Sequence, residues 1–295
     1  MIKIKHAYLI IANRNAKQLQ ILIDTIDDQR NDIYLLFDKK TEMYSCSFYT
    51  KFSNLYVLPP IKIYWGSFSL VQAEINLFKV ASLHYNYEYY HLLSGLDLPL
   101  FNQDQIHDFF DRNRGKEFLG YSDTKSKDEL STRLKYRMFR NNYRKYNLVN
   151  RLQEKLTHFE VQRKVPKNKI GFASNWVSIT DDLVRLIISN EQFVQRKFKN
   201  GRLMDEIFIP TLLNYYPEYK KNIYYSIPMH DKPDDFQGNL RYINWWDGTP
   251  HIWRKEDYSQ LIKARKMGHL FSRKFDEKVD SKIINEVLQN FVYNK

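Results

Sequence analysis

Two cations near the end of the chain have the clearest chemical potential. Arg241 begins the segment RYINWWDGTPHIW, and Lys274 lies in FSRKFDEKVD. If they converge on one site, an arginine fork and a lysine point charge could neutralise the roughly two to three negative charges of a diphosphate as its bond breaks. Each residue taken singly is equally well explained as a surface cation, because separation in sequence proves no contact.

Carboxylates occur at two positions where they could act on a ligand. Asp205 and Glu206 open a predicted helix in MDEIFIPTLL. Taken alone, they are better explained by N-terminal capping and interaction with the helix dipole, worth about 0.3 to 1 kcal/mol. Asp38 ends a predicted strand, where a carboxylate can accept hydrogen bonds from a ribose hydroxyl or a base NH group. The more ordinary interpretation of Asp38 is a turn residue at the end of the strand.

The sequence predicts no metal site. It contains no Asp-x-Asp pattern, with which many nucleotide-sugar enzymes hold a divalent metal, and its histidines and single cysteine are too scattered to predict zinc. Protein cations would then have to neutralise any bound diphosphate. Four tryptophans in the second half could stack on sugar rings, and we expect one of them to face a ligand while the others lie in the core: Trp176, Trp245, Trp246 and Trp253.

The first forty residues predict the elements that would position these groups. His6–Ala12 and Ile33–Phe37 are apolar runs typical of buried strands, and the segment between them carries apolar residues at helical spacing. This order predicts a parallel pair of strands with a right-handed crossover. AlaAsnArgAsn at 12–15 replaces the glycine-rich phosphate loop, so a standard dinucleotide fold is not expected.

The rest of the chain continues the alternation of strands and helices, which predicts an α/β protein with one sheet spanning most of the chain. We expect further strands at Ile61–Tyr64, Tyr89–Leu93, Glu117–Gly120, Trp176–Ile179, Asn222–Ile227 and Leu240–Trp245. Helices are expected near 70–84, 102–113, 181–190, 205–214 and 279–292.

Charge is concentrated in one segment. The net charge is +12, and residues 133–169 hold twelve Lys and Arg against two Glu. We expect 126–170 to form a basic helical insertion. Apolar residues from Leu148 to Phe159 recur there at helical spacing, so this helix could rest on an anionic membrane, or it could simply pack on the domain. The lone Cys46 suits a reducing compartment, and no apolar run reaches the ~20 residues that span a bilayer.

Taken together, these segments resemble the family of core-2/I-branching β-1,6-N-acetylglucosaminyltransferases and peptide O-xylosyltransferases. The resemblance runs in order over nearly the whole chain, and the tail with WDGTP and RKF is closer to the xylosyltransferase branch. The matching blocks are AYLIIANRNAKQLQILIDTI, IYLLFDKKT, IYWGSFSLVQAEI, YYHLLSGLDLPL, SNWVSIT, DEIFIPTLL, RYINWWDG and FSRKFDEKV.

The resemblance implies a GT-A-like, Rossmann-related mixed sheet flanked by helices, and an inverting transfer from a UDP-sugar that needs no metal. Glu206 matches the catalytic base, and Arg241 with Lys274 matches the pair that neutralises the departing UDP. Residues implied at the donor are Asp38, Trp65 and Ser67, and residues implied at the acceptor or substrate side are Asp97, Trp176 and Asp205.

The whole chain is thus expected to form one glycosyltransferase domain. Residues 1–125 would be its nucleotide-binding half, and 171–295 its acceptor and diphosphate-binding half. With one cysteine and no membrane anchor, the chain resembles a bacterial, cytoplasmic member, peripheral at the inner face of the plasma membrane, that acts on a glycan or lipid-linked glycan in surface polysaccharide synthesis. Xylose, N-acetylglucosamine, glucose and galactose all remain possible donor sugars.

Two other functional classes fit parts of the sequence. Aromatic residues alternate with Lys and Arg in KYRMFRNNYRKYN, as in proteins that bind nucleic acid without catalysis. No DNA- or RNA-binding motif accompanies this segment, so a nucleic-acid partner is not expected. A catalytically inactive, lectin-like relative is the third interpretation, which ligand binding without release of UDP would reveal.

Overall fold

The fold is described from a computed structural model that covers residues 5–122, 125–135, 165–248 and 250–293. Its first unit is the parallel pair expected from the sequence. Strand β1 (His6–Ala12) leads through helix α1 (Ala16–Ile26) to strand β2 (Asn31–Phe37), and β1 pairs with β2 from His6 opposite Asn31 onward. All seven residues of β2 are buried, as is typical of a parallel strand that is covered on both faces.

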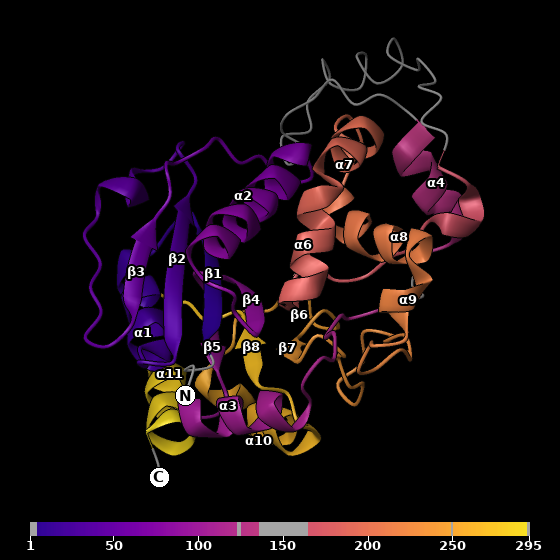
Figure 1. Cartoon of the computed structure of the whole chain (residues 1–295). Coiled ribbons are helices and arrows are strands. Elements are labelled where there is room, and N and C mark those ends of the chain that lie inside the picture. The colour runs from indigo at the N-terminus through magenta and orange to yellow at the C-terminus, as the bar shows by residue number, and fades with distance from the viewer. Residues whose placement is uncertain (1–4, 123–124, 136–164, 249, 294–295) are drawn as a thin grey trace, which may run out of the picture.

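The main sheet has five strands in the order β3-β2-β1-β4-β6. Strands β3 (Asn54–Val57) and β4 (Tyr89–Ser94) run parallel to their neighbours, and β6 (Ser178–Thr180) pairs antiparallel to β4. This mixed, mainly parallel sheet with helices on its faces confirms the α/β class expected from the sequence (Figure 1). The carboxyl ends of β1, β2 and β4 therefore lie along one edge.

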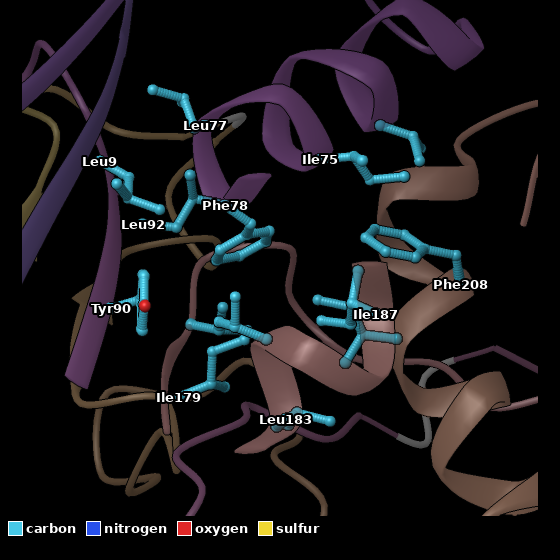
Figure 2. Close-up of a cluster of buried hydrophobic side chains, with 14 of the residues drawn as sticks. Leu9, Ile75, Leu77, Phe78, Tyr90, Leu92, Ile179, Leu183, Ile187 and Phe208 are labelled. Carbon is cyan, nitrogen blue, oxygen red and sulfur yellow. The ribbon is translucent and has the colours of Figure 1, made fainter. Parts of the chain in front are cut away.

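Helices cover both faces of this sheet because successive side chains of a strand point to opposite sides. On one side Leu9 and Leu92 pack with helices α2 (Phe68–His84) and α6 (Asp181–Ser189), as Figure 2 shows around Phe78 and Ile187. On the other side lie α1, α3 (Gln103–Arg112), α10 (Tyr258–Met267) and α11 (Ser281–Val287). Each face is thereby closed by a core of fully buried apolar residues.

The expectation of one sheet spanning most of the chain is wrong, because a second sheet is present. Its order is β5-β8-β7, with β5 at Asp97–Pro99, β8 at Phe271–Arg273 and β7 at Arg241–Ile243. The outer edge of β6 is already occupied, since Ser178 exchanges backbone hydrogen bonds with Phe118. Strand β7 consequently pairs with β8 and not with β6. Both sheets bury residues in one core.

Most remaining elements follow the expected pattern with shifted bounds. The extended segments at 117–120 and 222–227 make only isolated bridges, such as Glu117 with Ile223, and Ile61 bridges to Asp38. Helix α8 (Phe208–Tyr215) follows a short 3-10 turn at Met204–Glu206, and Leu288–Val292 continues α11 as a π-helical turn. Elements that the sequence analysis did not predict are β3, β5, β8, α7 (Glu191–Phe198), α9 (Pro217–Lys220), α10 and the 3-10 turns at Glu42–Ser45 and Lys255–Asp257.

Only the two ends of the predicted basic insertion are described. Helix α4 (Lys127–Lys135) and a 3-10 turn at Lys167–Lys169 belong to it, and the apolar residues from Leu148 to Phe159 lie outside the described residues. Within the described part of the chain, no helix is both long enough and apolar enough to span a membrane.

Candidate active site

Two adjoining cavities lie at the carboxyl edge of the main sheet. The smaller, about 420 Å³, is lined by residues that follow β1, β2 and β4, and the larger, about 750 Å³, lies beside it toward the 3-10 turn at Met204–Glu206 and helix α4. In open α/β sheets this edge is where ligands bind. The residues that line both cavities, and so mark their junction, are Trp65, Leu70, Trp176, Arg273 and Lys274.

Asp38 lies in the smaller cavity, directly after β2. Its Oδ1 accepts hydrogen bonds from the backbone N–H groups of Lys40 (3.0 Å) and Ile63 (3.2 Å), and its Oδ2 is 2.8 Å from Lys40 Nζ. Asn13 and Arg14, from the segment that replaces a glycine-rich loop, line the same cavity. A nucleoside placed here would meet a fixed carboxylate and a set of polar side chains.

The junction of the cavities contains two consecutive cations at the end of β8. Lys274 was expected here from the sequence, whereas Arg273 was not, although it is its neighbour in the RKF motif. The Arg273 guanidinium is centred 4.2 Å from the Trp176 ring, and its Nε is 3.4 Å from Asp97 Oδ1. Burial lowers the Arg273 pKa from its ordinary value, an effect that Asp97 opposes.

Asp97 itself lies behind this cation instead of in a cavity. It is fully buried and accepts hydrogen bonds from the backbone N–H (2.9 Å) and hydroxyl (2.6 Å) of Ser94. These contacts fix the turn between β4 and β5 and place a negative charge behind Arg273. The structure therefore relates Asp97 to the cation, and its implied place at the acceptor side stays a prediction.

Arg241 does not line either cavity. Its side chain is fully buried, and its guanidinium donates to Ser178 Oγ (2.7 Å) and to the carbonyl groups of Asn239, Leu92 and Val177. Burial lowers the Arg241 pKa to about 9. The guanidinium thus ties β7 to β4 and β6, and the expected convergence of Arg241 with Lys274 on one exposed site is not seen. Its implied role at the diphosphate stays a prediction.

Carboxyl groups gather on the far side of the larger cavity. Asp205 and Glu206 line it, and Asp205 Oδ1 is buried and has no hydrogen-bond partner in the part of the chain that the structure describes. Burial raises the pKa of both carboxyl groups; the charge of Glu206 raises that of Asp205 further, while Arg133 opposes the rise at Glu206. Glu74, which the sequence analysis missed, lies fully buried behind them and accepts a hydrogen bond from Asn175 (3.3 Å). The Glu206 carboxyl group is thereby subject to two opposed effects, burial, which raises its pKa, and Arg133, which lowers it.

The aromatic residues divide between cavity and core. Trp65, Trp176 and Trp245 line the cavities, while Trp253 is fully buried. Ser67 is buried at the start of α2, where its Oγ accepts from the Ser69 N–H (3.2 Å) and lies 2.6 Å from the Ser69 hydroxyl. Ser67 lines neither cavity and caps the helix beside Trp65.

Among the described residues, no group of three or more His, Cys, Asp or Glu side chains is arranged to hold a metal ion. Arg273 and Lys274 bring positive charge to the junction. The arrangement offers a nucleoside-sized cavity, a cationic junction and a carboxylate facing a second, larger cavity.

Comparison with known proteins gives two matches. The sequence model of the Core-2/I-Branching enzyme family matches residues 6–271. A xylosyltransferase from Caenorhabditis briggsae is 24% identical over 330 aligned residues, which take in 97% of this chain and 36% of the relative. The chain therefore spans about a third of the length of that relative.

Proposed function

The chain belongs to the Core-2/I-branching enzyme family, and on that premise we propose that it is a glycosyltransferase that moves a sugar from a UDP donor to a hydroxyl group of a glycan. The observation that carries the proposal is the order of the site. A cavity at the sheet edge, a pair of cations and a half-buried carboxylate follow one another across two adjoining cavities. This is the order of nucleoside, diphosphate and reacting hydroxyl in such a transfer.

The donor is proposed to lie with its uridine in the smaller cavity and its diphosphate at the junction. Asp38 can accept hydrogen bonds from the nucleoside, and Arg273 with Lys274 can neutralise the charge that grows on the leaving UDP. Trp176 and Asp97 hold the Arg273 guanidinium in place before the donor arrives. A cation that needs no rearrangement stabilises the transition state more than one that must be ordered.

The acceptor is proposed to enter the larger cavity, where Glu206 would take the proton from its hydroxyl. That oxygen attacks the anomeric carbon while the bond to the diphosphate breaks and its electron pair leaves with UDP. Attack from the side opposite the diphosphate inverts the anomeric centre. A base of this kind contributes roughly 10²- to 10⁴-fold to the rate, and burial raises the Glu206 pKa toward the pH at which such a base works best.

The sugar rings have aromatic partners in the same cavity. Trp245 is 38% exposed and lines the larger cavity, while Trp65 lies at the junction. Indole faces stack on the apolar side of sugars, which supports a glycan acceptor.

A panel of UDP-sugars tests the proposal. We expect one donor to be consumed in the presence of glycan acceptors, with UDP released and a product whose anomeric configuration is opposite to that of the donor by NMR. Because Arg273 and Lys274 supply the positive charge, the rate should be unchanged by EDTA. Strict dependence on added manganese would contradict the metal-independent mechanism, and salt-dependent binding of nucleic acid without affinity for UDP would contradict the proposal itself.

A further inference from the structure

The proposed base has one close protein partner that the family comparison does not assign. Glu206 Oε2 is 2.9 Å from an N–H group of Arg133, which belongs to helix α4. The Arg133 side chain is only 11% exposed and that of Glu206 is 30% exposed, and both line the larger cavity. Among the described residues no hydrogen bond engages Glu206 Oε1. Within the described part of the chain, the carboxylate is therefore held through one oxygen, and the other is left for a ligand.

Arg133 is held from several directions. Its second terminal nitrogen lies 3.4 Å from Glu129 Oε1, one turn earlier in α4, and its guanidinium is centred 5.6 Å from the Phe172 ring. Its backbone carbonyl accepts a hydrogen bond from the Arg202 N–H (3.4 Å), just before the turn that carries Glu206. An arginine fixed by a carboxylate, a ring and the main chain can impose a direction on the carboxylate it bonds.

Charges of both signs lie near Glu206. The hydrogen-bonded partner, Arg133, therefore decides whether the ionised or the protonated form of Glu206 is favoured. On the acidic side are Asp205 in the same turn and Glu129 in α4, and the buried Glu74 in α2 interacts with Asp205. On the basic side, Lys125 acts without a hydrogen bond to Glu206, whereas Arg133 acts through charge and hydrogen bond together. Among the described residues, Arg133 is thus the main group that favours the ionised form of the Glu206 carboxyl, whereas burial favours the protonated form.

We propose that Arg133 is a positioning residue for the transfer: it holds Glu206 through Oε2 in the ionised state, so that Oε1 accepts the proton of the acceptor hydroxyl. This inference rests on the proposed function of Glu206 as base. It also gives helix α4, at the start of the basic insertion, a direct connection to the chemistry. A base misdirected by about 1 Å can lose on the order of 10² in rate, so the contact is large enough to matter.

The test is the pH profile of kcat for Arg133→Gln, with Lys125→Gln as the control that removes the same charge from the same cavity without breaking a bond to Glu206. Without Arg133 the Glu206 pKa rises, so the acidic limb of the Arg133→Gln profile moves to higher pH. The plateau kcat falls roughly 10- to 100-fold, while the KM for the UDP-sugar stays within about twofold, because the donor cations are separate. Lys125→Gln should shift the limb less.

Two outcomes separate the possible failures. If Arg133→Gln keeps the wild-type melting temperature and its acidic limb does not move, Arg133 does not position the base. If Glu206→Gln is also fully active, the function proposed for Glu206 fails instead. Should Arg133→Gln not fold, Arg133→Lys replaces it. The lysine keeps the positive charge but lacks the planar guanidinium, so the acidic limb of the pH profile should stay in place while kcat falls. An unchanged kcat would overturn the inference.

Discussion

At the residue scale, the junction of the two cavities depends on Arg273 and Lys274. Arg273→Met or Lys274→Met should weaken binding of UDP about 10- to 100-fold, because a hydrogen bond to a charged group contributes roughly 1.5 to 3 kcal/mol. Isothermal titration calorimetry measures the change, with Lys282→Met as a control that removes an exposed cation from helix α11. Wild-type UDP affinity in both junction variants would remove this pair from the donor site.

For Arg241 we expect a loss of stability and not a loss of UDP binding, because its guanidinium hydrogen-bonds to other groups of the protein. Arg241→Met leaves the Leu92 carbonyl without the donor that it has in the wild type, and removes one of two donors from the Val177 carbonyl, which also accepts from the Leu92 N–H. We expect the free energy of unfolding in urea to fall by about 2 to 5 kcal/mol. Arg241→Lys should recover part of that loss. A variant of unchanged stability that no longer binds UDP would show that Arg241 reaches the donor, as the family pattern implied.

The site residues differ in how far the sequence could locate them. Asp38 could be placed because it follows a strand that ends at the sheet edge, whereas Glu206 and Lys274 were assigned through the family resemblance; all three line the cavities. Arg133 could not, since its contact with Glu206 joins residues 73 positions apart and arises only when α4 folds back over the site. Burial of Arg241 was equally hidden, because an arginine in a three-residue strand carries no periodic signal.

At the element scale, the turn that carries Glu206 owes its form to the proline that follows. A helix starting at Asp205 would place Pro210 beyond its first turn. There the proline ring clashes with the carbonyl group four residues earlier, and the helix lacks one backbone N–H donor. The chain instead forms a 3-10 turn at Met204–Glu206 and starts α8 at Phe208, which puts Pro210 in the first turn. The sequence predicted the helix correctly but not this break, and the break is what exposes Glu206 to the cavity.

Gly171 packs directly against the start of α8, which provides a test at this scale. A Cβ atom there would lie 2.7 Å from the backbone of Pro210, and the neighbouring Ala173 N–H donates to the Glu206 carbonyl (3.0 Å). Gly171→Ala should therefore cost about 1 to 3 kcal/mol of stability. The displaced turn should also lower kcat by up to about 10²-fold.

UDP affinity is the internal control for Gly171→Ala, because the smaller cavity and the junction do not contact this segment. We expect calorimetry to give the wild-type affinity while the transfer assay gives the reduced kcat. Equal activity of the two proteins would mean that the position of the 3-10 turn does not limit the reaction.

At the scale of the whole molecule, the sequence predicted the α/β class but not the number of sheets. Buried strands with continuous apolar runs, such as β1 and β2, are visible in any sequence. Strands of three residues, such as β7 and β8, carry too few side chains to show a period. Their pairing depends on which sheet edge remains open after the chain has folded.

The two sheets nevertheless share one core, since Tyr8 and Leu93 of the first pack in the same cluster as Tyr242 and Phe271 of the second. We therefore expect one cooperative unfolding transition, as is usual for a single core. Tryptophan fluorescence and far-UV circular dichroism should give coincident urea curves. Two separated transitions would show that the sheets unfold independently.

The account as a whole stands on Glu206 as the group that takes the acceptor proton. The most direct measurement is the transfer rate of Glu206→Gln at saturating donor and acceptor, with UDP affinity measured on the same preparation. The amide keeps the shape of the side chain but cannot accept the proton, so the rate should fall roughly 10²- to 10⁴-fold while UDP binds as tightly as to the wild type. Transfer at the wild-type rate with the same UDP affinity would contradict the account.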